Sequence, residues 1–284
     1  MKSEPLTPIH PSHIFLADVH LGSTTIPTSE VQTSLLALFQ WAKKHSASVF
    51  ILGDLFDYWM EFTQKNITPE SRLKSKASIP SFGQEIVAAL AAYNSSDNAI
   101  HYVLGNHDYW DDGLFEQLGC HTSPEGFYIS LDEHKIALLH GDGLPSTRTK
   151  TNVARLNHLE RPLLHTILRS KTFLYLFRKL FTPTTAWNIM RLFSSHNRKK
   201  KDQPVEIMDT KLTRFINTTD VDVVIAGHDH IARKVKTTKG HYYNTGPFFN
   251  NMQLLVYSSG NFFHANWNAK NQAFITTEPI SYTV

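Results

Sequence analysis

Five short hydrophobic segments, each ending at a small or polar residue, form the clearest pattern along the chain. They are rich in β-branched and aromatic residues and cover residues 13–17, 48–52, 99–104, 135–139 and 221–226. Short segments of this kind predict buried β-strands. The sequence therefore predicts five strands whose ends carry polar side chains.

Two helical patterns lie between the first of these strands. Apolar residues recur at helical spacing after Ser29 and after Ser81, and Gln32 and Gln84 stand three positions later, as in a capping box. Strands that alternate with helices favour parallel crossovers and a parallel or mixed sheet with helices on its faces. Ligands of such sheets bind beyond the carboxyl ends of the strands, where the polar residues fall.

Residues 144–215 break this alternation. Pro162 suits the first turn of a helix that Pro183 would end, and the segment as a whole has the pattern of a helical insertion or cap. The predicted organisation is one α/β domain over residues 12–284, interrupted by the insertion at 144–215 and preceded by a flexible N-terminus at 1–11.

Composition indicates a folded domain, because 41% of the 284 residues are hydrophobic, enough for a sizeable core. The one cysteine, Cys120, cannot form an internal disulfide, which favours a reducing cytoplasm. The most apolar stretch, residues 163–181, contains four basic residues that a bilayer-spanning helix does not tolerate easily. We therefore expect a cytoplasmic protein that does not cross a membrane.

Positive charge is concentrated in one part of the chain. Residues 148–201 hold thirteen Lys or Arg and one acid, Glu160, which gives +12. Because the whole chain carries +3, the remainder carries −9. Such a segment indicates either a solvated basic helix face or a surface that meets anions. Its aromatic residues follow helical spacing and do not suggest a base-stacking platform, so nucleic acid is not an expected partner.

The polar residues at the five strand ends are of the kinds that bind divalent metal ions. They occur in the motifs DVH, GD, GNHD, HGD and GHDH, and the candidate ligands are Asp18, His20, Asp54, Asn106, His140, His228 and His230. Carboxylate, amide and imidazole ligands without a thiolate suit Mn²⁺, Fe or Zn²⁺. Each motif alone is weak, because Asp often caps a helix and His is often an interior polar residue. All five in order, each closing a predicted strand, favour one shared site.

Two ion sites can be assembled if Asp54 bridges them. The sites are then Asp18, His20, Asp54 and His230 for one ion and Asp54, Asn106, His140 and His228 for the other. Two divalent ions and two aspartates, with a deprotonated water between the ions, leave a charge of +1 that attracts phosphate. Ions about 3.5 to 4 Å apart activate water and clamp the oxygens of an in-line displacement. This chemistry predicts hydrolysis of a phosphate ester or a diphosphate.

His107 lies inside GNHD, between Asn106 and Asp108, and would stand beside the ions without binding them. It would protonate the departing oxygen or stabilise charge on the phosphoryl group, while Asp108 would hold its tautomer and orientation. The predicted catalytic residues are therefore His107 and Asp108.

The order DVH, GDLFD, GNHD, HGD and GHDH over residues 18–230 resembles the calcineurin-like metallophosphoesterases. The resemblance implies a four-layer α/β/β/α sandwich with a dinuclear metal site, and its ligand assignment agrees with the one above. Mn²⁺ is the expected ion, with Fe or Zn²⁺ as alternatives.

Three further segments resemble the UDP-2,3-diacylglucosamine diphosphatases of lipid A synthesis. They are GDLFDYWMEF at 53–62, HGDGL at 140–144 before the basic insertion, and YYNTGPFF at 242–249. The resemblance implies cleavage of UDP-2,3-diacylglucosamine to UMP and 2,3-diacylglucosamine 1-phosphate. The expected partners are this nucleotide-linked glycolipid and an anionic membrane surface, at the cytoplasmic face of the inner membrane. His107 stands where many members have Arg, and Asp229 where Thr is usual.

The insertion would bind the substrate through basic and apolar side chains. The residues expected to contact it are Arg148, Lys150, Arg155, Leu164, Leu168, Phe173 and Phe177. For the apolar ones, the alternative is packing of the cap on the core. Two other functions stay open: a phosphodiesterase or nucleotide diphosphatase with a soluble substrate, and a non-catalytic membrane-associated scaffold.

Overall fold

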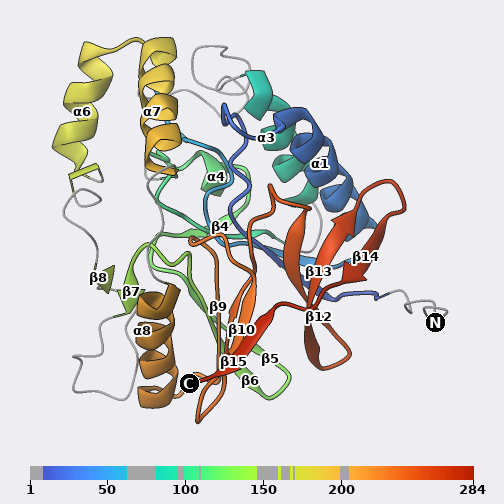
Figure 1. Ribbon diagram of the computed structural model, residues 1–284. Coiled ribbons are helices and arrows are strands. Elements are labelled where there is room, and N and C mark those ends of the chain that lie inside the picture. Colours follow the sequence, from blue (N-terminus) through green and yellow to red (C-terminus); the bar gives the residue numbers. More distant parts are fainter. Residues whose placement is uncertain are drawn as a thin grey trace.

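Two large mixed β-sheets lie face to face within the described part of the chain (Figure 1). The structure is a computed structural model that describes residues 9–62, 81–94, 99–108, 110–145, 159–160, 167–168, 170–198 and 205–284. Across the first sheet the strands are β14 (Ala273–Thr276), β13 (Asn261–Asn268), β12 (Gln253–Ser258), β1 (His13–Leu16), β2 (Ser48–Ile51), β3 (His101–Val103) and β4 (His121–Ser123). Across the second they are β15 (Ile280–Thr283), β10 (Arg233–Lys236), β11 (His241–Asn244), β9 (Val223–Ala226), β6 (His134–Leu138) and β5 (Phe127–Leu131).

The five predicted strands are confirmed as β1, β2, β3, β6 and β9, with ends within two residues of those expected. The first three are parallel neighbours, with Phe15 opposite Phe50 and Phe50 opposite His101. In the second sheet β6 and β9 are parallel, with Leu138 opposite Ile225. Parallel strands end at the same edge, so each sheet gathers its own strand-end residues at one place.

Alternation of side chains along the strands builds the layers. In β1 and the residue after it, Phe15 and Ala17 face a cluster between the sheets, whereas Ile14 and Leu16 face the opposite side. In β9 the inward residues are Val223 and Ile225. Because both faces of each strand are buried, the strands are almost continuously hydrophobic.

Helices cover both outer faces of the sandwich. Helices α1 (Thr28–Lys44) and α3 (Ser81–Asn94) cover the first sheet, and α8 (Val205–Thr218) covers the second through residues such as Phe215. These layers confirm the expected α/β/β/α sandwich. The capping box expected at Ser29 is not formed, because α1 begins at Thr28 and its N-cap Pro27 makes no side-chain hydrogen bond. Pro11, which the sequence assigned to a flexible terminus, is buried.

The described part of residues 144–215 is mainly helical. Helices α6 (Lys171–Leu180) and α7 (Pro183–Arg198) pack against each other at one end of the molecule (Figure 1), and β7 (Leu144–Pro145) pairs with β8 (Leu159–Glu160). Pro183 begins α7, and α6 has already ended at Leu180, so this proline starts a helix instead of ending one. None of the described helices combines the length and the apolar character that crossing a bilayer requires.

Candidate metal centre

All seven candidate ligands lie at the edge of the sandwich where β1, β2, β3, β6 and β9 end. Five of them have a left-handed backbone, with φ between 48° and 77°: Asp18, His20, Asp54, His228 and His230. Residues other than glycine rarely adopt this conformation, and such strain concentrates at functional sites. The strand-end turns therefore hold the backbone of these five residues in a conformation that costs conformational free energy.

Glycines allow the strand ends to approach one another. A Cβ on Gly105 would lie 2.2 Å from Oδ1 of Asp54, and a Cβ on Gly227 would lie 2.8 Å from Oδ2 of Asp18. A side chain at either position would displace a carboxylate of the site. The glycines of GNHD and GHDH are thus required by close approach.

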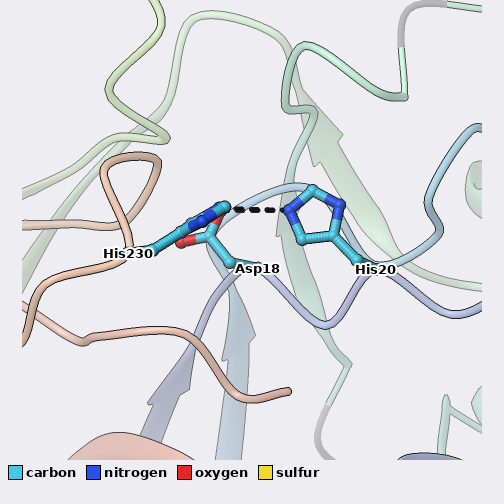
Figure 2. Close-up of side chains that lie close together, drawn as sticks. All are labelled: Asp18, His20 and His230. Carbon is cyan, nitrogen blue, oxygen red and sulfur yellow. Dashed lines mark hydrogen bonds and ion pairs between the residues drawn. The ribbon is translucent and has the colours of Figure 1, made fainter. Parts of the chain in front are cut away.

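The first cluster of donor atoms consists of Asp18, His20 and His230 (Figure 2). Nε2 of His230 lies 3.2 Å from Nε2 of His20 and 3.5 Å from Oδ1 of Asp18. That Oδ1 atom is buried and makes no hydrogen bond to the described residues, whereas Oδ2 accepts one from the backbone N–H of His228 at 2.8 Å. Ligands around an ion at about 2.0–2.2 Å lie roughly 3–3.5 Å apart, so the spacing suits a cation.

The second cluster surrounds Nε2 of His140. This nitrogen lies 3.1 Å from Oδ1 of Asn106, 3.2 Å from Nδ1 of His228 and 3.4 Å from Oδ2 of Asp54. Nδ1 of His140 donates to the backbone oxygen of Leu52 at 2.7 Å, which turns Nε2 toward the other donors.

Asp54 joins the two clusters. Its Oδ2 atom lies 3.4 Å from Nε2 of His140 and 3.8 Å from Nε2 of His20. Burial opposes its charge, but His140 and His107 outweigh burial and hold the pKa of Asp54 well below its ordinary value. In turn, burial disfavours a charged His140, yet the Asp54 charge raises the pKa of His140 to about 10. Without a cation, a proton on His140 thus neutralises part of the carboxylate charge, and that proton must leave before Nε2 can bind a metal.

His107 faces the same site from the GNHD turn. Its backbone N–H donates to Oδ1 of Asp54 at 2.9 Å, and its Nε2 lies 3.8 Å from Oδ2 of the same residue. Nδ1 of His107 donates to the backbone oxygen of Asp57. The structure thus corrects the role expected of Asp108, whose Oδ2 instead accepts from the backbone N–H groups of Asp54 at 2.7 Å and Gly105 at 3.0 Å. Asp108 shapes the turns and does not orient the His107 ring.

A model of the calcineurin-like phosphoesterase family matches residues 13–232, which is most of the chain. The chain belongs to this family. This phosphoesterase is therefore a metal-dependent hydrolase, and its family implies divalent ions at a site where the structure gathers Asp and His donors.

The phosphoesterase is also similar to proteins named UDP-2,3-diacylglucosamine hydrolase. One from Hamiltonella defensa is 27% identical, over 77% of this chain and 77% of its own. One from Nitrosococcus oceani is 28% identical over 76% and 77%, and one from Yersinia pseudotuberculosis is 29% identical over 77% and 82%.

The expected substrate contacts of the phosphoesterase are described only in part. Arg148, Lys150, Arg155 and Leu164 lie outside the described residues. Leu168 is buried, and its backbone oxygen accepts from Nε1 of Trp110 at 2.6 Å. Phe173 and Phe177 lie 6.1 and 5.2 Å from the Trp110 ring, measured between ring centroids. The described members of this set thus pack toward the core.

Two residues near the site of this phosphoesterase were not among its predicted site residues: Asp57 was expected to begin a helix, with a role towards Asp54 or His20 as the less favoured alternative, and Trp110 had no predicted role. Asp57 is buried, and its Oδ1 lies 3.6 Å from Nδ1 of His20. Trp110 follows the GNHD motif and joins it to the insertion, where Arg178 forms an ion pair with Asp112 at 2.7 Å. Their closeness in sequence to GD and GNHD was the one available signal.

Proposed function

We propose that this phosphoesterase hydrolyses the diphosphate of UDP-2,3-diacylglucosamine to UMP and 2,3-diacylglucosamine 1-phosphate, using two divalent metal ions. The substrate is supported by relatives of that name at 27–29% identity over about three quarters of the chain. The observation that carries the chemistry is the donor cluster around Nε2 of His140, joined through Asp54 to the cluster of Asp18, His20 and His230.

The donor atoms of the described residues have the chemistry and the spacing needed to bind two ions. Oδ1 of Asp18 is buried without a hydrogen bond to the described residues, and the donor atoms within each cluster lie 3.1–4.0 Å apart, which suits cations better than hydrogen bonds alone. In this proposal the residues around one ion are Asp18, His20, Asp54 and His230, and those around the other are Asp54, Asn106, His140 and His228. Mn²⁺ is the proposed ion. When bound, the ions lower the pKa of water and neutralise charge on the phosphoryl oxygens.

His107 is the proposed proton donor to the departing oxygen. Its Nδ1 hydrogen is occupied by the backbone oxygen of Asp57, so a second proton must reside on Nε2, the ring nitrogen nearer Asp54. A positively charged imidazole there would also stabilise negative charge on the phosphoryl group.

Helix α6 is the proposed contact with acyl chains and an anionic membrane surface. Leu176 is 50% exposed and Leu180 is 75% exposed, and Lys171 and Lys179 are exposed on the same short helix. Exposed leucines beside basic side chains suit the boundary between headgroups and acyl chains. In this proposal the protein lies peripherally on the cytoplasmic face of the inner membrane. Sedimentation with vesicles should require anionic lipid and should weaken for Leu180→Glu.

The decisive experiment measures Mn²⁺-dependent release of UMP from detergent-dispersed UDP-2,3-diacylglucosamine. Asp54→Asn should abolish release, whereas Asp220→Asn should not, because Asp220 is 62% exposed in a surface pair with Lys135. If only bis(p-nitrophenyl) phosphate is hydrolysed, the metal chemistry stands and the lipid substrate is wrong. If neither substrate is hydrolysed and micromolar Mn²⁺ does not bind, a scaffold role replaces the enzymatic one.

A further inference from the structure

A second charged cluster lies behind the metal centre, between the second sheet and α8. Arg233, the first residue of β10, is buried and contacts carboxylates on two sides. Its NH2 nitrogen lies 2.6 Å from Oδ1 of Asp209 and 2.5 Å from Oδ2 of Asp229. Nε also donates to Asp209 at 2.9 Å, and NH1 donates to Oδ1 of Asp229 at 2.8 Å. A buried guanidinium is tolerated only when it is paired as fully as this one.

Asp229 is the residue between His228 and His230 in the GHDH turn. Its Oδ1 accepts from the backbone N–H of Ile231 at 3.3 Å and from Nδ2 of Asn244 at 2.8 Å, in addition to Arg233. Nδ2 of Asn244 also donates to the backbone oxygen of Gly227 at 2.8 Å, at the other end of the turn. Oδ1 of Asp229 is therefore linked directly to the Ile231 end of the turn and, through Asn244, to the Gly227 end.

The backbone of this turn requires such support. His228 and His230 have φ values of 77° and 63°, a left-handed conformation that is uncommon for residues other than glycine and that surrounding contacts must hold in place. Nδ1 of His228 belongs to the cluster around His140, and Nε2 of His230 belongs to the cluster with Asp18 and His20. A small rotation of the turn would move both nitrogens, and each would leave a different cluster.

We propose that Asp229 and Arg233 are positioning residues for metal binding: their ion pair holds the GHDH turn in the conformation that presents one histidine to each ion. This inference rests on the proposed two-ion site. Asp209 anchors the guanidinium from α8 and accepts a hydrogen bond from the hydroxyl of Tyr282 in β15, on the side away from the metal centre. The cluster thus has a half that reaches the turn, through Asp229 and through a 3.0 Å hydrogen bond from NH1 of Arg233 to the backbone oxygen of Ile231, and a half that anchors Arg233 from α8, through Asp209.

This division supplies a matched pair of variants. Asp229→Asn keeps the shape of the side chain and removes the charge that holds Arg233. Tyr282→Phe removes one hydroxyl from the far half and leaves the contact between Arg233 and Asp229 unchanged. Arg233→Lys keeps the positive charge but cannot bridge two carboxylates in the same way, and the double variant Asp229→Asn/Arg233→Lys tests whether the two residues act through one contact.

The test is a titration of each purified variant with Mn²⁺, with free Mn²⁺ followed by electron paramagnetic resonance and folding followed by circular dichroism. Wild type should bind two ions. Asp229→Asn should remain folded and bind Mn²⁺ about 10–100-fold more weakly, and Tyr282→Phe should bind as wild type does. The double variant should bind Mn²⁺ no more weakly than whichever of the two single variants has the lower Mn²⁺ affinity. Raising Mn²⁺ should restore hydrolysis of bis(p-nitrophenyl) phosphate by Asp229→Asn, with a higher Mn²⁺ requirement and a similar kcat.

Wild-type affinity in folded Asp229→Asn would overturn this inference alone, as would an equal loss in Tyr282→Phe. If Arg233→Lys does not fold, the comparison of Asp229→Asn with Tyr282→Phe still decides the matter. A wild-type protein that binds no Mn²⁺ would overturn the proposed function and this inference with it.

Discussion

Substitution of Gly53 by alanine should damage the metal centre through a collision with His140. Gly53 has φ +90°, and a Cβ there would lie 2.3 Å from Nδ1 of His140 and 2.9 Å from Cα of Gly105. Because ordinary contact begins at 3.4 Å, His140 must move by about 1 Å, and a displacement of that size lowers catalytic rates by about 10²-fold. The movement also breaks the 2.7 Å hydrogen bond from Nδ1 of His140 to Leu52, which orients the ring.

Gly113→Ala is the matched control for this substitution. Gly113 has φ +89°, yet a Cβ there would meet nothing within 4 Å. Both variants place alanine in a left-handed conformation, at a cost of about 1–2 kcal/mol, and Gly53→Ala adds an overpacking cost of about 1–3 kcal/mol. At about 2–4 °C per kcal/mol, Gly113→Ala should lower Tm by about 2–8 °C, and Gly53→Ala should lower it further.

The two variants should separate in function more sharply than in stability. The assay is Mn²⁺-dependent hydrolysis of bis(p-nitrophenyl) phosphate, measured well below both melting temperatures together with Mn²⁺ affinity. Gly113→Ala should retain wild-type values, and Gly53→Ala should lose about 10²-fold in rate and bind Mn²⁺ more weakly. Wild-type Mn²⁺ affinity and rate in Gly53→Ala would refute the steric reasoning, because His140 would then not have moved.

Three further predictions concern His107, Asp111 and the ions. His107→Gln should lower kcat by about 10²–10⁴-fold and leave Mn²⁺ affinity unchanged, whereas a parallel loss of affinity would make His107 a ligand. Burial and a hydrogen bond with Glu61 raise the pKa of Asp111 from 3.8 to about 9, so the folded state binds a proton that the unfolded chain releases, and stability falls as pH rises between these values. Asp111→Asn carries no such charge and should raise Tm by at least about 2 °C at pH 8, with the difference vanishing near pH 4; an equal gain at both pH values would contradict this cause. Mn²⁺ at about 100 times its Kd should stabilise wild type by about 2.7 kcal/mol for each ion bound, seen as a rise in Tm that a chelator reverses and that Asp54→Asn lacks.

The strands and the strand-end donors could be predicted because their signals are local. A run such as residues 48–52 contains its own strand pattern, and the Gly53–Asp54 turn follows it directly. The left-handed backbone at Asp54 left no comparable sign in the sequence, because it follows from hydrogen bonds to residues of the GNHD turn more than fifty positions away.

Features that depend on contacts between residues far apart in the chain could not be predicted from the sequence. His107 was paired with Asp108, its neighbour in the chain, but its ring binds the backbone of Asp57, fifty residues earlier. Asp229 had no assigned partner, and its partner Arg233 is itself anchored from α8 by Asp209. The sequence of helix α8 fell within the predicted insertion at 144–215, and a helical pattern does not reveal which surface the apolar face covers.

The donor set is divided between the two sheets. The first sheet contributes Asp18, His20, Asp54 and Asn106, and the second contributes His140, His228 and His230. Neither sheet alone can surround an ion with the proposed ligands. An ion bound here would therefore join the two sheets at this edge of the sandwich. Parting of the two sheets at this edge would separate the ligands of each ion, so bound ions would oppose that opening.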